Sequence, residues 1–265
     1  MSRGRVLVVA GSDSGGGAGI QGDIKTITVL GGYAATAITA LTVQNTLGVT
    51  DILAIPPAFI AAQMQTVLAD VGADAVKIGM LGDAATIVAV ADVLEAVTIP
   101  IVLDPVMIAK GGASLLAPDA VALLKSRLIP MATVVTPNAP ELGRLTGRPV
   151  TSNAQALAAG RALMASMRTA VLVKGGHLEG DTVTDILLTA DGEFAFTAPR
   201  QSTPHTHGTG CALASAIACG LAQGMDLVPA TARAHAFVAA AIRAAPGVGK
   251  GHGPLGHLEA ARALA

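Results

Sequence analysis

Short apolar runs alternate along most of the chain with longer segments whose apolar residues recur at helical intervals. Residues 5–10 form such a run, which ends at glycines, and residues 20–30 after it have helical spacing. This alternation is typical of a parallel sheet with a helix between successive strands. The runs that predict strands are residues 5–10, 34–43, 50–55, 74–78, 101–103, 133–135 and 170–174.

The segments between these runs predict helices. They are residues 20–30, 56–71, 83–97, 118–128, 153–166 and 228–245, a short helix opening at residues 138–141, one from Cys211 and a last one at the C-terminus. Residues 185–189 and 193–197 predict a hairpin around Asp191-Gly192. No linker, repeat or low-complexity tract divides the chain. We therefore expect residues 1–265 to form one α/β domain, a doubly wound, mainly parallel sheet with helices on both faces.

Composition excludes several functional classes. Hydrophobic residues make up 52% of the 265 residues and aromatic residues 2%, so we expect a large core of Val, Leu, Ile and Ala. The net charge is −1 and no basic block occurs, which argues against nucleic-acid binding. No apolar run is long enough to span a membrane, and the N-terminus lacks the pattern of a signal peptide.

The two cysteines indicate a reducing compartment. Cys211 and Cys219 are the only cysteines in the sequence. On one helix they would lie roughly 12 Å apart along the axis, which is too far for a disulfide with each other. We therefore expect a cytoplasmic protein.

Residues 204–218 are the most informative stretch. A loop with two glycines turns into a helix that is apolar nearly all round. The first turn, Gly208 to Cys211, would present unpaired N–H groups that bind an anion and favour a thiolate at Cys211. On spacing alone, an ordinary helix cap followed by a small buried cysteine explains the stretch equally well.

Polar residues follow several of the expected strands: Gln44, Asp104, Asn138 with Glu141, and Lys174 with His177. Because the carboxyl ends of parallel strands meet at one edge of a sheet, this placement predicts a catalytic cleft. Asp104 and Glu141 are suited to holding Mg²⁺ through waters and phosphates, although Glu141 is equally suited to capping its own helix. Lys174 is either a phosphate ligand or a solvated surface charge.

Three other motifs give weaker evidence of function. Residues 17–22 match a dinucleotide-binding pattern, but nothing acidic lies between Asp23 and Asp51 to hold a ribose. A flexible loop that approaches a small ligand, with Asp23 close behind, explains them better. Residues 247–251 lack the final Ser or Thr of a phosphate-binding loop and predict a structural turn. The histidines at 177, 205 and 207 lack zinc-site spacing.

Seven motifs in order give the chain its resemblance to a known family. They are residues 11–21, 42–46, 77–80, 104–107, 138–141, 174–177 and 206–211, the last reading Thr-His-Gly-Thr-Gly-Cys. Nearly end to end, the chain resembles the hydroxymethylpyrimidine/phosphomethylpyrimidine kinases of thiamine biosynthesis, within the ribokinase-like superfamily. Relatives that act on sugars or pyridoxal usually carry Asp at the position of Cys211.

The resemblance implies an enzyme that uses ATP and Mg²⁺ twice. It would phosphorylate 4-amino-5-hydroxymethyl-2-methylpyrimidine to the monophosphate and then to the diphosphate. Such kinases often form homodimers. We also expect residues 110–113 to close over the site.

The resemblance also implies residue roles. Cys211 would take the hydroxyl proton, with Lys174 and the amides of Gly208 and Gly210 stabilising the transferred group. The pyrimidine would lie near Gly11, Ala18, Gly19, Asp23, Val43, Met80 and Val106, with Gln44 at its ring edge. ATP phosphates would contact Lys174, Thr206, Gly208 and Thr209, and Asp104 and Glu141 would organise the metal.

Three alternatives remain open at this point. A pyridoxal kinase is chemically close, but Cys211 and the segment around Gln44 argue against it as the main activity. A non-catalytic pyrimidine sensor is disfavoured by the joint presence of Asp104, Glu141, Lys174 and Cys211. An NAD-linked oxidoreductase is disfavoured by the missing acidic ribose ligand.

Overall fold

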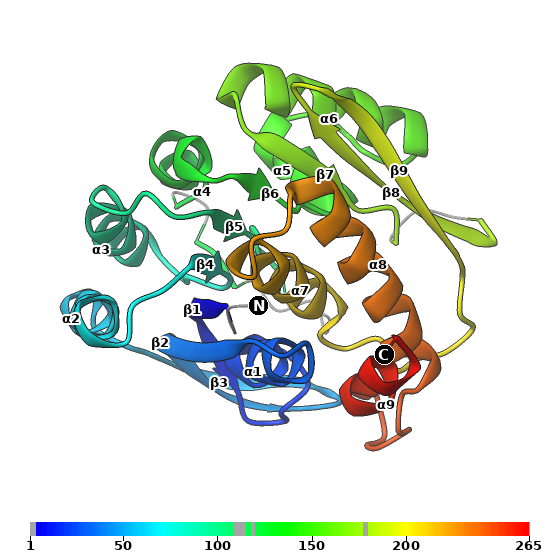
Figure 1. The fold of residues 1–265 in the computed structure, drawn as a ribbon, viewed down its shortest axis with the longest axis horizontal. Helices are drawn as coiled ribbons and strands as arrows, with labels where there is room; N and C mark the ends of the chain where they lie inside the picture. Colours follow the sequence, from blue (N-terminus) through cyan, green and yellow to red (C-terminus); the bar gives the residue numbers. More distant parts are fainter. Residues whose placement is uncertain (1–3, 109–114, 118–119, 177–179, 265) are drawn as a thin grey trace.

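The computed structural model describes residues 4–108, 115–117, 120–176 and 180–264, and one mixed sheet runs through them (Figure 1). Nine strands of these residues pair in the order β3-β2-β1-β4-β5-β6-β7-β8-β9. In chain order they are β1 (Arg5–Asp13), β2 (Tyr33–Asn45), β3 (Gly48–Ala54), β4 (Ala75–Ile78), β5 (Ile101–Leu103), β6 (Val134–Val135), β7 (Ala170–Val173), β8 (Thr182–Thr189) and β9 (Gly192–Pro199).

Most of the strands are parallel, and the antiparallel ones lie at the two ends of the sheet. Six neighbouring strands run parallel, in the sheet order β2, β1, β4, β5, β6 and β7, and helices join most of them. The edge strand β3 is antiparallel to β2, and β8 and β9 form the hairpin predicted around Asp191-Gly192. The expectation of a mainly parallel, doubly wound sheet is confirmed.

Helices cover both faces of the sheet (Figure 1). One face carries α1 (Gly19–Val29), α7 (Thr209–Ala222), α8 (Leu227–Arg243) and α9 (His257–Leu264). The other carries α2 (Pro57–Asp70), α3 (Ala84–Leu94), α4 (Ala120–Leu123), α5 (Ala139–Thr146) and α6 (Asn153–Met167). A π-helical segment, Leu124–Leu128, and a 3-10 turn, Ile129–Met131, continue α4.

Strand alternation divides the core into two layers. In β1, Leu7 and Val9 pack with the layer under α2 to α6, whereas Val6 and Val8 pack with the layer under α1, α7 and α8. All four side chains are almost fully buried. Because successive side chains of a strand point to opposite faces, a strand buried on both faces reads as a continuous apolar run.

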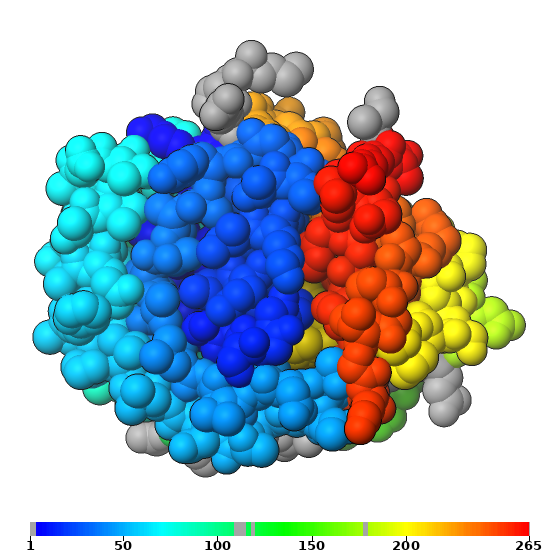
Figure 2. All heavy atoms as spheres, turned by 90° about the horizontal axis from the view of Figure 1, so that it is seen from below, coloured from blue at the N-terminus to red at the C-terminus, as the bar shows by residue number. Residues whose placement is uncertain are grey.

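The C-terminal segment packs against the N-terminal part of the chain. In Figure 2 the C-terminal segment, red and orange, lies against the blue segment that contains α1 and β2. Thr46 Oγ1 accepts hydrogen bonds from the backbone N–H of Lys250 at 3.1 Å and of Gly251 at 3.2 Å. The Gly-rich C-terminal turn thus braces the end of β2, as expected of a structural turn.

Some boundaries differ from the predicted ones. β1 continues to Asp13, through residues that the glycines had suggested were loop, because Ser12 and Asp13 pair with β2. The helix predicted over 118–128 is described only from Ala120 and becomes π-helical. Residues 110–113 and His177 lie outside the described residues. Within the described ranges, no helix is long and apolar enough to cross a membrane.

Candidate active site

A cleft of about 560 Å³ opens at the carboxyl ends of β1, β4, β5, β6 and β7. This volume is within the usual range for small-molecule sites. The strand-end placement predicted from the sequence is therefore confirmed. The predicted site residues that line it are Gly11, Ala18, Gly19, Gln44, Met80, Val106, Asp104, Glu141, Lys174, Thr206, Gly208, Thr209, Gly210 and Cys211.

Two predicted site residues do not line the cleft. Val43 is 59% exposed and lies between Thr42 and Gln44, which do line it. Strand alternation from Thr42 directs Val43 away from the cleft wall, and its contact with the pyrimidine stays a prediction. Asp23 is fully buried, where it is bonded to Lys77 and Ser215. It is therefore close behind the site but not part of its surface.

The first turn of α7 forms the expected amide cradle. α7 begins at Thr209, two residues before the predicted start, with Gly208 as its N-cap at φ 85°. A side chain at Gly208 would also collide with the carbonyl oxygen of Gly17. In the described chain the amides of Gly210 and Cys211 have no hydrogen-bond acceptor, so they are available to an anion.

Gly210 keeps the cradle open to the charged residues beside it. A Cβ built there would lie 3.3 Å from Lys174 Nζ and 3.4 Å from Asp104 Oδ2. A larger residue would therefore push on both charged groups. The glycines at 208 and 210 thus serve different purposes, one for backbone conformation and one for space.

The acidity of Cys211 differs from the sequence-based expectation. Burial raises the pKa of the Cys211 thiol to about 11, although the charge of Lys77 and the backbone N–H of Gly19 act in the opposite direction. The expectation that the helix start lowers this pKa is therefore wrong, because desolvation of the thiolate outweighs the favourable groups. Cys211 still lines the cleft and is partly accessible.

Lys174 joins the two carboxylates. Its Nζ lies 2.8 Å from Asp104 Oδ1 and 3.9 Å from Glu141 Oε2, and Thr136 Oγ1 also donates to Asp104 Oδ1 at 3.0 Å. Burial favours the neutral amine, but the two carboxylates outweigh it and raise the pKa of Lys174. The side chain is 12% exposed, so Lys174 is not a solvated surface charge.

Glu141 has the capping role that the sequence left open. Its Oε2 accepts from the Asn138 backbone N–H at 2.8 Å, and Asn138 Oδ1 accepts from the Glu141 N–H at 3.0 Å, which completes a capping box. Burial raises the pKa of Glu141 to about 7, against the opposing charge of Lys174. The carboxyl is therefore partly protonated near neutral pH.

The same two carboxylates bear on the magnesium expectation. In the described part of the chain no group of three or more His, Cys, Asp or Glu side chains could hold a metal ion. Asp104 Oδ2 accepts no hydrogen bond from the described residues, so one oxygen remains available. This arrangement suits Mg²⁺, which usually keeps waters and takes phosphate oxygens beside one or two carboxylates.

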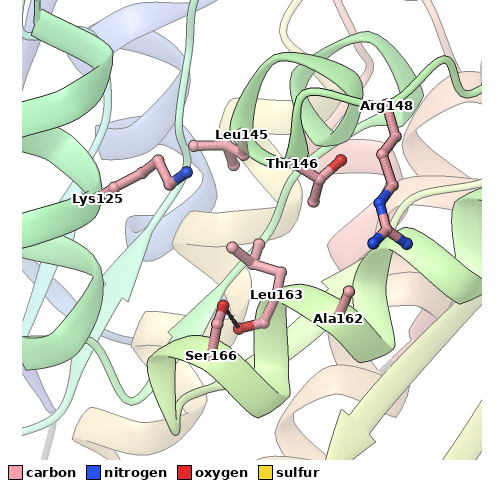
Figure 3. Close-up of a pocket in the computed structure, with 7 residues that line it drawn as sticks. All are labelled: Lys125, Leu145, Thr146, Arg148, Ala162, Leu163 and Ser166. Carbon is pink, nitrogen blue, oxygen red and sulfur yellow. Dashed lines mark hydrogen bonds between the residues drawn. The ribbon is translucent and has the colours of Figure 1, made fainter.

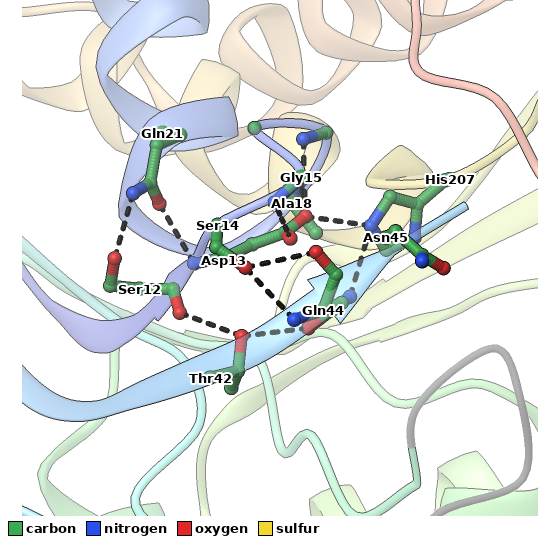
Figure 4. A network of polar contacts seen from close by, with 12 residues as sticks. Ser12, Asp13, Ser14, Gly15, Ala18, Gln21, Thr42, Gln44, Asn45 and His207 are labelled. Carbon is green, nitrogen blue, oxygen red and sulfur yellow. Dashed lines mark hydrogen bonds and ion pairs between the residues drawn. The ribbon is translucent and has the colours of Figure 1, made fainter. Parts of the chain in front are cut away.

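A polar network that the sequence did not reveal closes the other side of the cleft (Figure 4). Asp13 accepts hydrogen bonds from the backbone N–H groups of Gly15, Gly17 and Ala18 and lies 2.8 Å from His207 Nε2. Burial raises the pKa of Asp13, but His207 and the amides outweigh it, and the net shift is downward. His207 is 194 residues away in the chain, so no local pattern indicated this pair.

The network connects strand β2 to the loop that leads into α7. His207 lies on the loop that enters the amide cradle, and its Nε2 is 3.3 Å from Gln44 Nε2. Gln44 Oε1 accepts from Thr42 Oγ1 at 3.0 Å. Gln44, expected at the pyrimidine, thus contacts His207, which lies in the chain between Thr206 and Gly208, two residues expected at the phosphates.

A second cavity, of about 140 Å³, lies away from this chemistry (Figure 3). It shares no lining residue with the cleft. Its walls are Lys125, Leu145, Thr146, Arg148, Ala162, Leu163 and Ser166, none of them a predicted site residue.

Comparison with known proteins places the chain in a family. Residues 13–256 match the family model described as phosphomethylpyrimidine kinase. The thiamine biosynthesis bifunctional protein ThiED of Geobacter sulfurreducens is 52% identical over 98% of this chain, which spans 53% of that longer protein. The hydroxymethylpyrimidine/phosphomethylpyrimidine kinase of Rhizobium meliloti is 48% identical over 95% of this chain and 96% of its own length.

A solved structure supports the fold. The pyridoxal kinase of Bacillus subtilis, in its ADP complex, superimposes with a TM-score of 0.89 at 31% identity, covering 97% of this chain and 98% of its own. The expected ribokinase-like architecture is therefore confirmed. With the family model matching most of its length and close relatives covering nearly all of it, the chain belongs to the phosphomethylpyrimidine kinase family.

Proposed function

We propose that the protein transfers phosphoryl groups from ATP to 4-amino-5-hydroxymethyl-2-methylpyrimidine and then to the resulting monophosphate. The observation that carries this assignment is the meeting, in one cleft, of a free amide cradle, the Lys174 cation and a small apolar pocket. Phosphoryl transfer requires mainly positioning and charge stabilisation from a protein. The product would enter thiamine biosynthesis, the pathway in the name of the Geobacter relative.

The acceptor binds at the β1–β2 side of the cleft. Ala18, Met80 and Val106 supply apolar surface, and Gln44 is placed to hydrogen-bond the ring edge. Gly19 lies in the left-handed region at φ 53°, where a Cβ would collide with the Gly11 carbonyl oxygen. Glycine at position 19 therefore lets the loop pack against Gly11 at the edge of this pocket.

The donor binds at the start of α7. Thr206, Gly208 and Thr209 line this part of the cleft, with Lys174 beside them. The amides of Gly210 and Cys211, together with the Lys174 ammonium, stabilise the negative charge of the transferred group. Mg²⁺, held through waters and nucleotide phosphates near Asp104 and Glu141, supplies further charge neutralisation when bound.

Cys211 takes the acceptor proton in the first transfer. The hydroxyl proton passes to the Cys211 thiolate, the freed oxygen bonds to the γ-phosphorus, and the bond to ADP breaks. In the second transfer the acceptor is a phosphate that is already ionised, so a base contributes little. The raised thiol pKa makes the thiolate scarce at neutral pH but strongly basic.

Three wider properties complete the proposal. The continuous sheet supports one kinase domain over residues 1–265. The exposed apolar side chains of Leu41, Val43 and Leu53 on β2 and β3 support a homodimer. The free thiols of both cysteines support a reducing cytoplasm.

Product analysis tests the assignment directly. The protein is incubated with ATP, Mg²⁺ and the pyrimidine, and the products are separated by mass. We expect the monophosphate to appear first and the diphosphate to follow. ATP hydrolysis that does not depend on the pyrimidine, or the absence of both products, would contradict the assignment.

Pyridoxal phosphorylation is the second candidate. The observation that favours it is the close likeness to the Bacillus subtilis pyridoxal kinase. Both acceptors are heteroaromatic rings with a hydroxymethyl group. Comparison of kcat/KM for pyridoxal and for the pyrimidine separates the two, and we expect the pyrimidine to be preferred.

A further inference from the structure

A charged side chain lies at the floor of the cleft and is almost fully buried. Lys77, on the central strand β4, is the largest fully buried side chain in the described residues. Its Nζ lies 2.9 and 2.8 Å from the two carboxylate oxygens of Asp23, on α1. Ser215, on α7, donates to Asp23 Oδ1 at 2.7 Å and is also fully buried. Asp23, Lys77 and Ser215 are called the buried triad below.

Stability alone does not explain the buried triad. Removing two charges from water costs more than their attraction usually returns, so a buried pair is often no better than apolar residues of the same size. The surrounding layer is made of aliphatic residues such as Val8, Val102 and Leu213, which an apolar side chain would join without this cost. A role in the adjacent site is therefore the better explanation.

The buried triad lies next to Cys211. Ser215 follows Cys211 by four residues on α7, so the two share one helix face, one turn apart. α1, which carries Asp23, begins at Gly19, whose backbone N–H interacts with the Cys211 sulfur. Lys77 and Cys211 both line the cleft.

The ammonium has a donor to spare. An ammonium carries three N–H groups, and two of those of Lys77 are directed at Asp23. Gly79 leaves room around it, since a Cβ there would lie 2.9 Å from Lys77 Nζ. Among the described residues nothing accepts from the third N–H, which can therefore serve an anion at the cleft floor.

We propose that Asp23 and Ser215 hold the Lys77 ammonium as the counter-ion of the Cys211 thiolate during the first phosphoryl transfer. Lys77 is thereby a positioning residue that acts through Cys211. The inference rests on the proposed role of Cys211 as the base. When the hydroxyl proton reaches sulfur, the thiol becomes neutral and the ammonium remains paired with Asp23, so no other proton has to move.

The charges around Cys211 determine whether the thiolate fraction should rise or fall when the triad is changed. Lys77 from β4 favours the thiolate, whereas Asp23 from α1 and Asp104 from the end of β5 oppose it. The effect of Lys77 is larger than that of either carboxylate. Removing the Lys77–Asp23 pair should therefore make the thiolate scarcer, and loosening it should do so to a smaller degree.

Alkylation of Cys211 provides the test. In a Cys219→Ala background, iodoacetamide reacts with a single thiol, and its rate at pH 9 reports the thiolate fraction. The double variant Lys77→Met with Asp23→Asn removes both charges, so that no unpaired charge is left to prevent folding. We expect alkylation to slow by about threefold to tenfold, since one pKa unit changes the thiolate fraction tenfold.

Two further variants separate a field effect from a loss of packing. Ser215→Ala keeps both charges and should slow alkylation less than the double variant. Thr231→Ala removes a comparable buried hydroxyl on α8, bonded only to the Leu227 carbonyl in the described chain, and should leave alkylation unchanged. Thermal melts confirm that each variant is folded.

Single-turnover rates complete the test. The double variant should slow the first transfer by about the same factor as alkylation and leave the second nearly unchanged. Unchanged alkylation in the folded double variant, or equal losses in both transfers, would overturn the proposal. Failure of the base assignment shows separately: Cys211→Ala would then leave the first transfer intact, while the alkylation result still reports the ammonium–thiolate contact.

Discussion

Cys211 is the residue on which the two transfers should differ. Because only the hydroxyl acceptor must lose a proton, Cys211→Ala should slow the first transfer by about a hundredfold or more, within the usual range for a general base, and the second far less. Separate single-turnover assays measure the two rates, with Cys219→Ala as the control because it removes a buried thiol on the same helix that does not line the cleft. Equal losses would refute this division of labour.

The pH profile of the first transfer gives an independent check on the thiol. With the pKa of Cys211 at about 11, the thiolate fraction rises tenfold for each pH unit below that value. The first transfer should therefore accelerate throughout the alkaline range in which the protein stays folded. In the Cys211→Ala variant this slope should disappear. A wild-type plateau below pH 9 would contradict the raised pKa.

Glu141 links stability to pH. Its pKa is about 7 in the folded protein against 4.5 ordinarily, so folding favours the protonated form. The contribution of Glu141 to stability is then fully present below pH 4.5 and is lost as pH rises from there through 7. Glu141→Gln can retain the capping box and has no charge to bury. It should exceed the wild type in free energy of unfolding by about 3 kcal/mol at pH 8 and match it at pH 4.5, as urea titrations would show.

Pairs of residues that are distant in the chain could not be predicted from the sequence. The patterns placed Asp104, Glu141 and Lys174 at strand ends, and the sheet brings them together because parallel strands share one edge. Lys77 and Asp23, 54 residues apart, showed no pattern that indicates a pair. The prediction of a lowered pKa for Cys211 failed for the same reason, since the burial that raises this pKa comes from segments distant in the chain.

At the scale of elements, the start of α7 depends on the contact between two loops. Gly208 has φ 85° and a Cβ there would collide with the Gly17 carbonyl oxygen, whereas Gly224 has the same φ with open space around it. Gly224→Ala should cost only the conformational penalty, about 1–2 kcal/mol. Gly208→Ala should cost more and also slow both transfers, because it displaces the amide cradle.

The two glycine variants are compared by thermal melts and single-turnover rates. The matched φ isolates the steric contribution, since both pay the same backbone cost. Similar losses of stability in the two variants, with normal rates, would show that the loops can separate freely. A selective loss in Gly208→Ala would establish that the cradle needs the backbone of the Gly17 loop against it.

Elements were predictable where local chemistry decides them. The Asp191-Gly192 turn gave the β8–β9 hairpin, and the apolar run Ile101–Leu103 gave β5 with its bounds. Boundaries failed where tertiary contacts decide them. β1 extends past its glycine to Asp13 because β2 pairs with it, and α7 begins at Thr209 because Gly208 packs against the Gly17 loop.

At the scale of the whole molecule, the outer face of the β2–β3 edge is unusually apolar. Leu41 pairs with Leu53 across the two strands, and Val43 follows on the same face. These side chains are 41%, 64% and 59% exposed. An exposed apolar edge of a sheet is a site of association unless something covers it, and a second copy of this chain is the partner that we propose.

Leu53→Lys should therefore shift the dimer towards monomer. A lysine buried in an apolar interface loses its hydration without a partner, which costs enough to raise the dimer dissociation constant at least about a hundredfold. Sedimentation velocity over a concentration series measures the shift. Leu258→Lys on α9, where the native side chain is 48% exposed, is the matched control and should sediment as the wild type. Leu53 does not line the cleft, so both transfers should persist in the monomer. If both variants sediment alike, the dimer forms through another surface or not at all.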